Sequence, residues 1–314
     1  MWPTTDWRRP LKNTFWVSDA PLSYQSIRRF SVSIKLLVTD IDRTLVNSPH
    51  CASPSPRNIA ALRAASEQGV TVAIASGRNQ ASCRTFAQEL GLACPILANN
   101  GAEVFDGGEL RSRKPLSAAV SSYAVEFARA HKLTALCFSS CCMYLGHLGS
   151  ASENEALRRH YAVMNRIPDS SVITIDSQEA LSRLLEDGAL QIEFLAPTPE
   201  QAQTARLAWR AAMERGELPP MEVTSSYGLS FEIDALGVSK GAGVRILAGA
   251  RGLTADEILC VGDSENDASM FHACAHSVAM GNASDAVKAQ ARHVTAPVTE
   301  DGLALAIEKY VLGL

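Results

Sequence analysis

The chain has 314 residues, of which 46% are hydrophobic and 20% are charged. This length and composition predict a globular protein with one large domain or two ordinary ones. The formal net charge of -4 argues against a dedicated nucleic-acid-binding protein. No apolar run approaches the roughly 18 residues that span a bilayer, so the sequence predicts neither a nucleic-acid partner nor a membrane partner.

Residues 1–33 differ from the rest of the chain because tryptophans and arginines lie there without a clear period. They lack the long apolar core of a secretory signal. A transit peptide, a disordered tail and an over-extended translation start all remain open, and a disordered extension is the prediction. The chain has eight cysteines, but no Cys-x-x-Cys pair marks a metal site. A reducing cytoplasm is therefore the expected compartment.

From Ile34 onward, short apolar runs alternate with segments of helical spacing. The strands expected in this part of the chain lie at 34–39, 70–75, 95–98, 258–261, 277–280 and 293–295. Runs that are apolar on both faces are typical of buried parallel strands. Their alternation with helices predicts an α/β fold with a doubly wound parallel, Rossmann-like sheet.

Residues 104–227 are expected to form a separate α/β unit with its own sheet, which opens with the turn Asp106-Gly107-Gly108. The first unit then resumes, and Ser239 is expected to cap a helix that holds Lys240 in its first turn. We therefore predict a core domain at 34–103 and 228–314, with a cap domain inserted at 104–227.

Polar residues follow three of the expected core strands. Asp40 and Asp42 follow the first strand, Ser76-Gly77-Arg78 follows the second, and Asp263 follows the strand at 258–261. Ligands of such sheets bind beyond the carboxyl ends of the strands. Two carboxylates two residues apart can serve as a nucleophile and as an acid/base. Alone the pair is a weak signal, because Asp-x-Asp also occurs in turns and calcium loops.

The acidic residues of this edge require a positive partner. The four carboxylates belong to Asp40, Asp42, Asp263 and Asp267. Two unit charges ~4 Å apart repel by about 4 kcal/mol at an effective dielectric constant of ~20, and a phosphate would add to this repulsion. Lys240 offsets part of it. A divalent cation with oxygen ligands offsets more, and Mg²⁺ suits a site shared with phosphate.

In chain order, these segments resemble the motifs of the haloacid dehalogenase superfamily. The matching segments are Asp40-x-Asp42-x-Thr44, Ser76-Gly77-Arg78, Lys240 between glycines, and Gly262-Asp263-Ser264-Glu265-Asn266-Asp267. The position of the insertion is similar to that in the Cof-type (class IIB) phosphatases, which carry a large α/β cap. The resemblance covers residues 34–314.

The resemblance implies a role for each matching residue. Asp40 would be the nucleophile and Asp42 the acid/base. The implied Mg²⁺ ligands are Asp40, the Asp42 carbonyl and Asp263, with Asp267 in support. The implied phosphate-binding residues are Ser76, Gly77, Lys240 and Thr44, with Asn266 orienting the site. Arg78 and Asn100 are possible substrate contacts.

One residue departs from the family pattern, because Arg43 stands where the family usually has glycine. We expect its side chain to point away from the nucleophile. Glu193 and Glu232 lie in expected strands and could face a substrate, although solvent or core pairing is the favoured interpretation.

The resemblance implies a Mg²⁺-dependent phosphomonoester hydrolase that forms an aspartyl-phosphate. The implied substrate is a small phosphorylated metabolite, either a sugar phosphate or a phosphorylated cofactor. A phosphosugar mutase on the same scaffold and a non-catalytic ligand-binding protein are the alternatives. The sequence leaves open whether the protein is a monomer or a homodimer.

Overall fold

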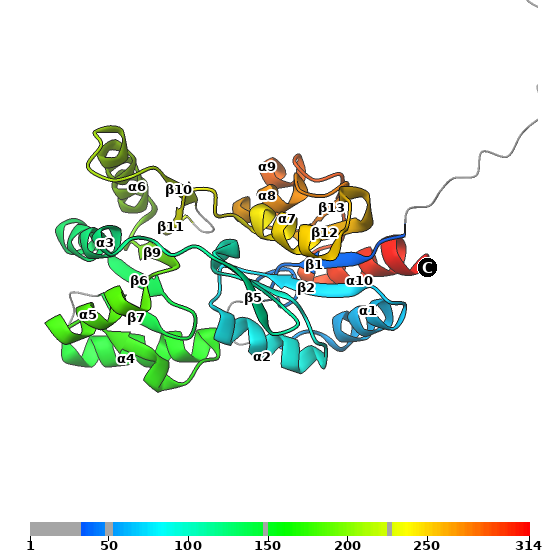
Figure 1. Ribbon diagram of the computed structural model, residues 1–314, viewed down its shortest axis with the longest axis horizontal. Coiled ribbons are helices and arrows are strands. Elements are labelled where there is room, and N and C mark those ends of the chain that lie inside the picture. The colour runs from blue at the N-terminus through cyan, green and yellow to red at the C-terminus, as the bar shows by residue number, and fades with distance from the viewer. Residues whose placement is uncertain (1–32, 48–52, 147–149, 225–227) are drawn as a thin grey trace, which may run out of the picture. The chain divides into compact units, whose positions relative to one another are not determined.

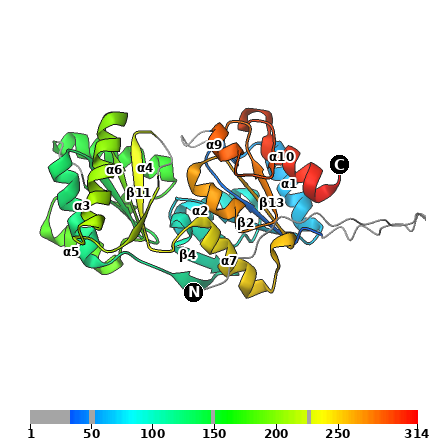
Figure 2. The same cartoon turned by 90° about the horizontal axis from the view of Figure 1, so that it is seen from above.

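The computed structural model describes residues 33–47, 53–146, 150–224 and 228–314. The predicted extension at residues 1–33 lies outside the described residues except for its last residue. Within the described ranges, no helix combines the length and the apolar character that crossing a bilayer requires. The described strands form two sheets, one with eight strands and one with six (Figures 1 and 2).

The eight-stranded sheet has the order β14-β13-β12-β1-β2-β3-β4-β5. Its strands are β1 (Leu36–Thr39), β2 (Thr71–Ala75), β3 (Ile96–Ala98), β4 (Glu103–Asp106), β5 (Glu109–Arg113), β12 (Ile258–Gly262), β13 (His276–Ala279) and β14 (His293–Val294). The pairs from β14 to β3 are parallel, whereas β4 and β5 are antiparallel additions at one edge.

Helices cover both faces of this sheet, as Figure 1 shows for α7 and α1. The helices are α1 (Pro56–Glu67), α2 (Gln80–Leu90), α7 (Lys240–Arg251), α8 (Ala268–Phe271), α9 (Asp285–Lys288) and α10 (Gly302–Ile307). Short helical turns are η1 (Asn99–Gly101), η3 (Ala255–Glu257), η4 (Glu265–Asp267), η5 (Val298–Glu300) and the π-helical η6 (Glu308–Leu312).

The apolar runs of the sequence explain this doubly wound arrangement. In β1, Leu37 packs into a core formed with α1, α2 and α10. Leu36 and Val38 point to the opposite side and pack into a core formed with α7, α8 and α9. A strand buried on both faces needs apolar residues at every position. The predicted fold class is confirmed.

The six-stranded sheet has the order β10-β11-β9-β6-β7-β8. Its strands are β6 (Thr134–Phe138), β7 (Met143–Gly146), β8 (Val172–Thr174), β9 (Gln191–Leu195), β10 (Met221–Thr224) and β11 (Ser230–Ala235). The helices of this part are α3 (Ala118–His131), α4 (Ala151–Asn165), α5 (Gln178–Asp187) and α6 (Pro199–Glu214), together with the short turn η2 (Asp169–Ser171).

The two faces of the six-stranded sheet are covered differently. Residues of α3, α5 and α6 pack on one face around the buried Trp209. On the other face, α4 packs on residues of β6, β7 and β8, and Phe138 and Tyr161 belong to this second cluster. Parts of β9 and β11 on that second face remain available to line a cavity.

Sheet membership differs from the predicted domain limits of 104 and 227. The turn at Asp106-Gly107-Gly108 joins β4 to β5 and therefore belongs to the eight-stranded sheet, not to the inserted unit. Both glycines have positive φ, as a tight hairpin requires. Strand β11 falls within the predicted core range 228–314, but it pairs with β9 and β10 in the second sheet. The division into core and cap itself stays a prediction.

The start of α7 is fixed by a close approach to α8. A Cβ atom on Gly241 would lie 2.0 Å from the carbonyl oxygen of Ser269. We expect Gly241→Ala to destabilise the protein by about 1–3 kcal/mol or more, because backbone atoms would have to move. Gly249→Ala is the matched control in the same helix, since nothing lies within 4 Å of its Cβ position.

The Gly249→Ala variant should gain up to about 1 kcal/mol through helix propensity. Chemical denaturation of both variants measures the difference. Equal stability of the two variants would contradict the packing described for the first turn of α7.

Candidate active site

Four neighbouring strands deliver polar residues to one edge of the eight-stranded sheet. Asp40 follows β1, Asp263 follows β12, Ser76 follows β2 and Asn99 follows β3. All four side chains are buried. Because these strands are parallel, their carboxyl ends meet at one edge, as the sequence predicted.

Lys240 joins two of the carboxylates at this edge. Its side chain is 2% exposed, and Nζ donates hydrogen bonds of 2.6 Å to Asp40 Oδ1 and of 2.6 Å to Asp267 Oδ1. Burial alone would lower the pKa of Lys240, but Asp267 and Asp40 raise it above its usual value. The ammonium therefore stays charged between the two carboxylates.

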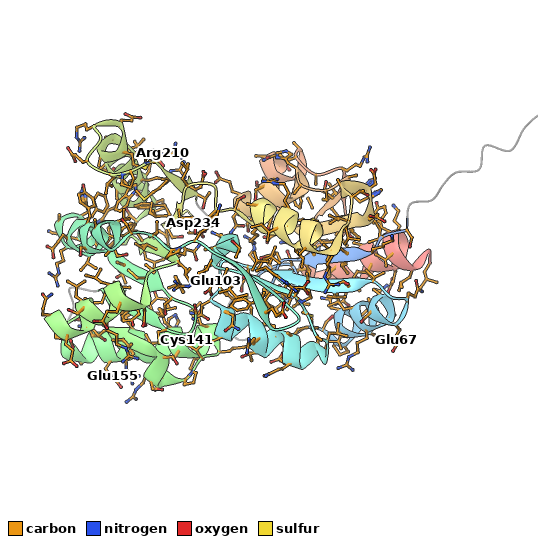
Figure 3. The ribbon with its side chains drawn as sticks, viewed as in Figure 1. Glu67, Glu103, Cys141, Glu155, Arg210 and Asp234 are labelled. Carbon is orange, nitrogen blue, oxygen red and sulfur yellow. The ribbon has the colours of Figure 1, made fainter. Side chains whose placement is uncertain are left out.

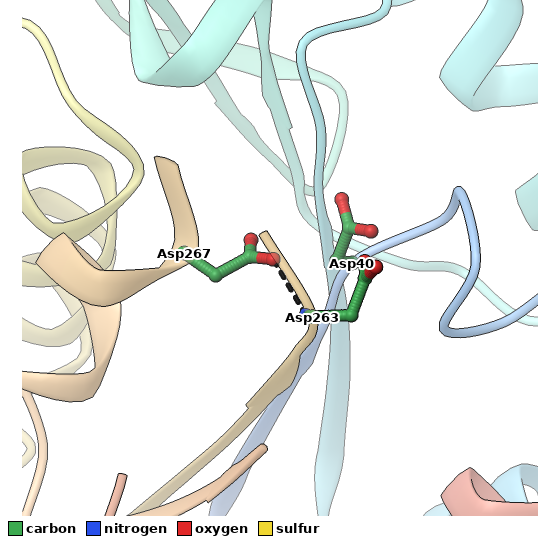
Figure 4. A group of neighbouring side chains, drawn as sticks. All are labelled: Asp40, Asp263 and Asp267. Atoms are coloured by element: carbon green, nitrogen blue, oxygen red, sulfur yellow. Dashed lines mark hydrogen bonds between the residues drawn. The ribbon is translucent and has the colours of Figure 1, made fainter. Parts of the chain in front are cut away.

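The backbone holds Asp267 in this position. Its Oδ2 accepts a hydrogen bond of 2.8 Å from the amide of Asp263 (Figure 4) and another of 2.8 Å from the amide of Ser264. A Cβ atom on Gly262 would lie 2.4 Å from the Asp267 carboxyl carbon, so only glycine fits at that position. The end of β12 is thus shaped around the Asp267 carboxylate.

Arg43 points toward Asp263 and the loop that follows β13. Its Nε lies 3.4 Å from Asp263 Oδ2, and its Nη2 donates a hydrogen bond of 3.1 Å to the Asn282 carbonyl. Asn282 donates in return to the Arg43 carbonyl at 3.0 Å. The side chain does not line the cavity that contains Asp40, which agrees with the expectation from the sequence. Arg43 nevertheless has a φ of 60°, a conformation that favours glycine.

Asp42 faces Arg78 across the edge of the sheet. Arg78 donates to both carboxylate oxygens of Asp42, at 2.8 and 2.7 Å, and also to the carbonyl oxygen of Met164 at 2.7 Å. Met164 lies in the last turn of α4. Arg78 therefore connects the Asp42 carboxylate with the six-stranded part of the protein and is not free to contact a ligand without losing a partner.

Thr44 and Asn100 occupy positions that differ from their predicted roles. Thr44 is fully buried and donates to Asp263 Oδ1 at 3.4 Å, so it supports that carboxylate. Asn100 is also buried, and its amide donates to Glu232 and Asp234 at 2.7 and 3.1 Å. Asn266 donates to the Asn100 side-chain oxygen at 3.1 Å, which links the two sheets through amides.

A cavity of about 530 Å³ opens on this edge. The residues that line it from the eight-stranded part are Asp40, Asp42, Ser76, Gly77, Arg78, Lys240, Ser264 and Asn266. Strands β6, β9 and β11, helix α4 and Leu229 supply the remainder. The cavity therefore brings most of the predicted site residues together with side chains from the second sheet.

The charge of Lys240 does not fully offset the negative charge of the carboxylates at this site. Burial raises the pKa of Asp40 well above its usual value, and the neighbouring Asp267 and Asp263 raise it further against the effect of Lys240. Burial and Asp267 raise the pKa of Asp263 to about 6. Oxygen atoms of these three residues all lie within 4.8 Å of one another (Figure 4). This donor set fits a hard divalent cation such as Mg²⁺.

The sequence matches the family model for haloacid dehalogenase-like hydrolases over residues 37–307. The chain belongs to this family. The resemblance inferred from the motifs is confirmed, as is the prediction of an enzyme of the phosphatase class, since curated relatives that span most of this chain are named phosphatases.

Two curated relatives span almost the whole hydrolase. One is 5-amino-6-(5-phospho-D-ribitylamino)uracil phosphatase YcsE of Bacillus subtilis, which is 28% identical over 91% of this chain and 100% of its own length. The other is pyridoxal phosphate phosphatase YbhA of Escherichia coli, which is 27% identical over 90% of this chain and 100% of its own length.

Solved structures of the family have the same fold as this hydrolase. A haloacid dehalogenase-like hydrolase from Bacteroides thetaiotaomicron superposes with a TM-score of 0.73 at 26% identity, covering 88% of this chain and 99% of its own. The subclass IIB sugar phosphatase BT4131 superposes with a TM-score of 0.72 at 24% identity, covering 88% and 98%. At 24% identity, the similarity to BT4131 shows a shared fold and nothing further.

The structure places Glu193 and Glu232 in the lining of the cavity. Glu232 also has buried partners in Asn100 and Gln191, as the favoured interpretation of core pairing expects, and a contact of either glutamate with a substrate stays a prediction. Tyr161, Phe138 and Gln191 also line the cavity, and the sequence motifs did not point to them. The alternation of polar and apolar residues at 191–195 and 230–235 was the available signal, because it marks strands with two different faces.

The cavity carboxylate of Glu193 generates a prediction about stability. Burial and the neighbouring Glu232 raise the pKa of Glu193 to about 8. The folded protein therefore binds the proton of the Glu193 carboxyl group more tightly than the unfolded chain does. The resulting stability is full below about pH 4.3, the ordinary pKa of glutamate, and is lost as the pH rises toward 8.

We expect Glu193→Gln to raise Tm relative to the unmodified protein by an amount that grows between pH 5 and pH 9. Glu214→Gln, at an exposed position at the end of α6, is the control and should show no such trend. Thermal unfolding at several pH values measures both differences. A Tm difference for Glu193→Gln that does not change with pH would contradict the raised pKa.

Proposed function

We propose that this hydrolase is a Mg²⁺-dependent phosphatase of small phosphorylated metabolites that works through an aspartyl-phosphate on Asp40. The observation that carries the proposal is the position of Asp40, which contacts Lys240 and lines the cavity together with Asp42. A candidate nucleophile, Asp40, and a candidate proton donor, Asp42, therefore line the same cavity and could both reach a bound ligand.

In this proposal, the Asp40 carboxylate attacks phosphorus and the bond from phosphorus to the leaving oxygen breaks. The Lys240 ammonium lies 2.6 Å from Asp40 and can also face a phosphoryl oxygen. Ser76 and Gly77 line the same cavity at the end of β2 and can hold the other oxygens. The charge that develops on the phosphoryl group would thus be met by groups already fixed in place.

Asp42 would give a proton to the leaving oxygen and later take one from the water that hydrolyses the aspartyl-phosphate. In the described structure, both oxygens of Asp42 accept hydrogen bonds from Arg78. Proton transfer therefore requires Asp42 to exchange at least one of these bonds for the substrate. Arg78 would act as a positioning residue for Asp42.

Mg²⁺ would be held by Asp40 and Asp263 with the Asp42 carbonyl, and Asp267 would support the site. Bound there, it would supply positive charge that the three gathered carboxylates lack. Thr44 and Ser264 would orient the Asp263 carboxylate, since both hydroxyls donate to its Oδ1.

The substrate class is supported by the relatives and by the size of the cavity. The named relatives act on a phosphoribitylaminouracil and on pyridoxal phosphate. A cavity of about 530 Å³ lies in the range of small-molecule sites. We propose a phosphorylated cofactor, a phosphorylated precursor of one, or a sugar phosphate as the substrate.

The sequence left two alternatives to a phosphatase, a non-catalytic binding protein and a phosphosugar mutase. The non-catalytic interpretation depended on Arg43 blocking Asp40, and Arg43 instead contacts Asp263 and Asn282. The mutase stays an alternative that product analysis with a bisphosphate activator separates. The compartment and the choice between monomer and homodimer stay predictions from the sequence.

The proposal is tested by phosphate release from a panel of phosphorylated metabolites, with Mg²⁺ and with a chelator. We expect Asp40→Asn to lose about a thousandfold or more in kcat, because the nucleophile is removed. Asp176→Asn, at an exposed position in the second part of the chain, is the matched control and should keep full activity. Turnover that survives in Asp40→Asn, or that does not need the metal, would overturn the mechanism.

Arg43 generates a prediction about metal affinity. Its guanidinium lies beside Asp263 and is 37% exposed, so its repulsion of a bound cation is partly screened. We expect Arg43→Gly to bind Mg²⁺ about threefold to tenfold more tightly. Arg43→Lys keeps the charge and is the control. Calorimetric titration with Mg²⁺ gives both affinities, and unchanged binding in Arg43→Gly would show that the guanidinium does not oppose the metal.

A further inference from the structure

The second sheet presents an acidic surface to the cavity. Successive residues of a strand point to opposite faces. In β9 and β11, Phe194 and Ile233 point into the core formed with α3, α5 and α6. The residues that alternate with such core positions are Gln191, Glu193 and Leu195 in β9, and Ser230, Glu232 and Asp234 in β11. Except for Asp234, all of these line the cavity.

Two of these carboxylates stand directly opposite each other. Glu193 pairs with Glu232 in the antiparallel register of β9 and β11. Like charges in such a cross-strand pair are unfavourable. Asp234, labelled in Figure 3, follows two residues after Glu232, so the two side chains point to the same face of β11. Asp234 is 1% exposed. A cationic group or a hydrogen-bond donor would therefore stabilise the arrangement of these three acidic side chains.

The described residues supply few donors to these acids. The Asn100 amide is shared between Glu232 and Asp234, and Gln191 donates to the same Glu232 oxygen at 3.3 Å. Thr224 also donates to this Glu232 oxygen at 3.5 Å, so three donors gather on Glu232 Oε2. Asp234 Oδ1 is buried and has no hydrogen-bond partner among the described residues.

The cationic side chains that line the cavity already have partners. Arg78 contacts Asp42, and Lys240 contacts Asp40 and Asp267. Apart from the titratable His160, these are the basic residues among the described lining of the cavity. The end formed by β9 and β11 thus offers the carboxyl groups of Glu193 and Glu232 to a ligand, and no described lysine or arginine there could receive a second anionic group.

The remaining walls of the cavity are apolar. The side chains that form them are Leu136, Phe138, Tyr161, Met164, Leu195 and Leu229. Such walls stabilise a flat or apolar skeleton through buried contact area. A polyol could donate hydrogen bonds to the two glutamates, but its hydroxyl groups would face these apolar walls without partners.

We propose that the cavity selects phosphomonoesters whose leaving group has an aromatic or apolar skeleton and carries a nitrogen donor at the end remote from phosphorus. An amine or a protonated ring nitrogen would donate to Glu193 and Glu232. A second phosphate or a carboxylate at that end is disfavoured. This inference rests on the proposed function and specifies its substrate class.

A matched set of three substrates tests the inference. The compounds are phenyl phosphates that carry an aminomethyl, a hydroxymethyl or a carboxyl group at the para position. We expect kcat/KM for the amine to exceed that for the alcohol by about tenfold, and the acid to be the poorest substrate, because charge-assisted hydrogen bonds are stronger than neutral ones. Equal turnover of the three compounds, or a preference for the alcohol or the acid, would overturn the inference.

Two variants test whether Glu193 and Glu232 cause the preference for the amine. In Glu193→Gln and Glu232→Gln, the ratio of kcat/KM for the amine to kcat/KM for the alcohol should fall toward one. Glu214→Gln is the control on α6, outside the cavity, and should keep the wild-type ratio. A ratio that survives in both cavity variants would assign the selectivity elsewhere and overturn the roles of Glu193 and Glu232.

Binding separates this inference from the proposed function. Calorimetry with the three corresponding non-hydrolysable phosphonates, on the unmodified protein and on Asp40→Asn, measures selectivity without turnover. Tighter binding of the amine with no turnover of any phosphate would support the inference and overturn the proposed function. Turnover without preference for the amine in rate or binding would overturn the inference alone.

Discussion

The site depends on one buried ammonium between two carboxylates. Lys240 contacts Asp40 and Asp267 at 2.6 Å each, and all three side chains are almost fully removed from solvent. Removing one partner of such a group leaves a buried charge that costs several kcal/mol. The end of β12 and the first turn of α7 must therefore keep fixed positions, and Gly262 and Gly241 allow the close contacts that this requires.

The two sheets contribute different chemistry to the same cavity. The parallel sheet supplies short, buried side chains at strand ends, where the backbone fixes each position. The second sheet supplies longer side chains from the middle of β9 and β11. Residues on the cavity face of these strands can be substituted without changing the residues that pack into the core on the opposite face. In this arrangement, the phosphoryl group and the leaving group are recognised by structurally independent surfaces. The Asn266–Asn100–Glu232 chain of hydrogen bonds is one polar link between them, and the contact of Arg78 with Met164 is another.

Much of the fold could be predicted because each buried parallel strand is an apolar run that ends at a polar residue, as at Asp40 and Asp263. The sequence did not reveal side-chain partners across long separations, such as Arg78 with Asp42 or Thr44 with Asp263. Sheet membership differs from the predicted limits of the inserted unit by one hairpin and one strand, because it depends on pairing and not on the order along the chain. The sequence could not decide between a substrate contact and core pairing for Glu193 and Glu232, since alternation shows that a strand has two faces but not what each face meets.

Two short connections join the two sheets. Residues 114–117 lead from β5 to α3, and residues 236–239 lead from β11 to α7. Each connection spans at most about 3.6 Å per residue. The second sheet also has its own buried core around Trp209. The recognition surface is therefore a module with two nearby attachment points. Gene rearrangement or protein engineering could replace it as a unit and redirect the enzyme to new substrates while the residues around Lys240 stay unchanged.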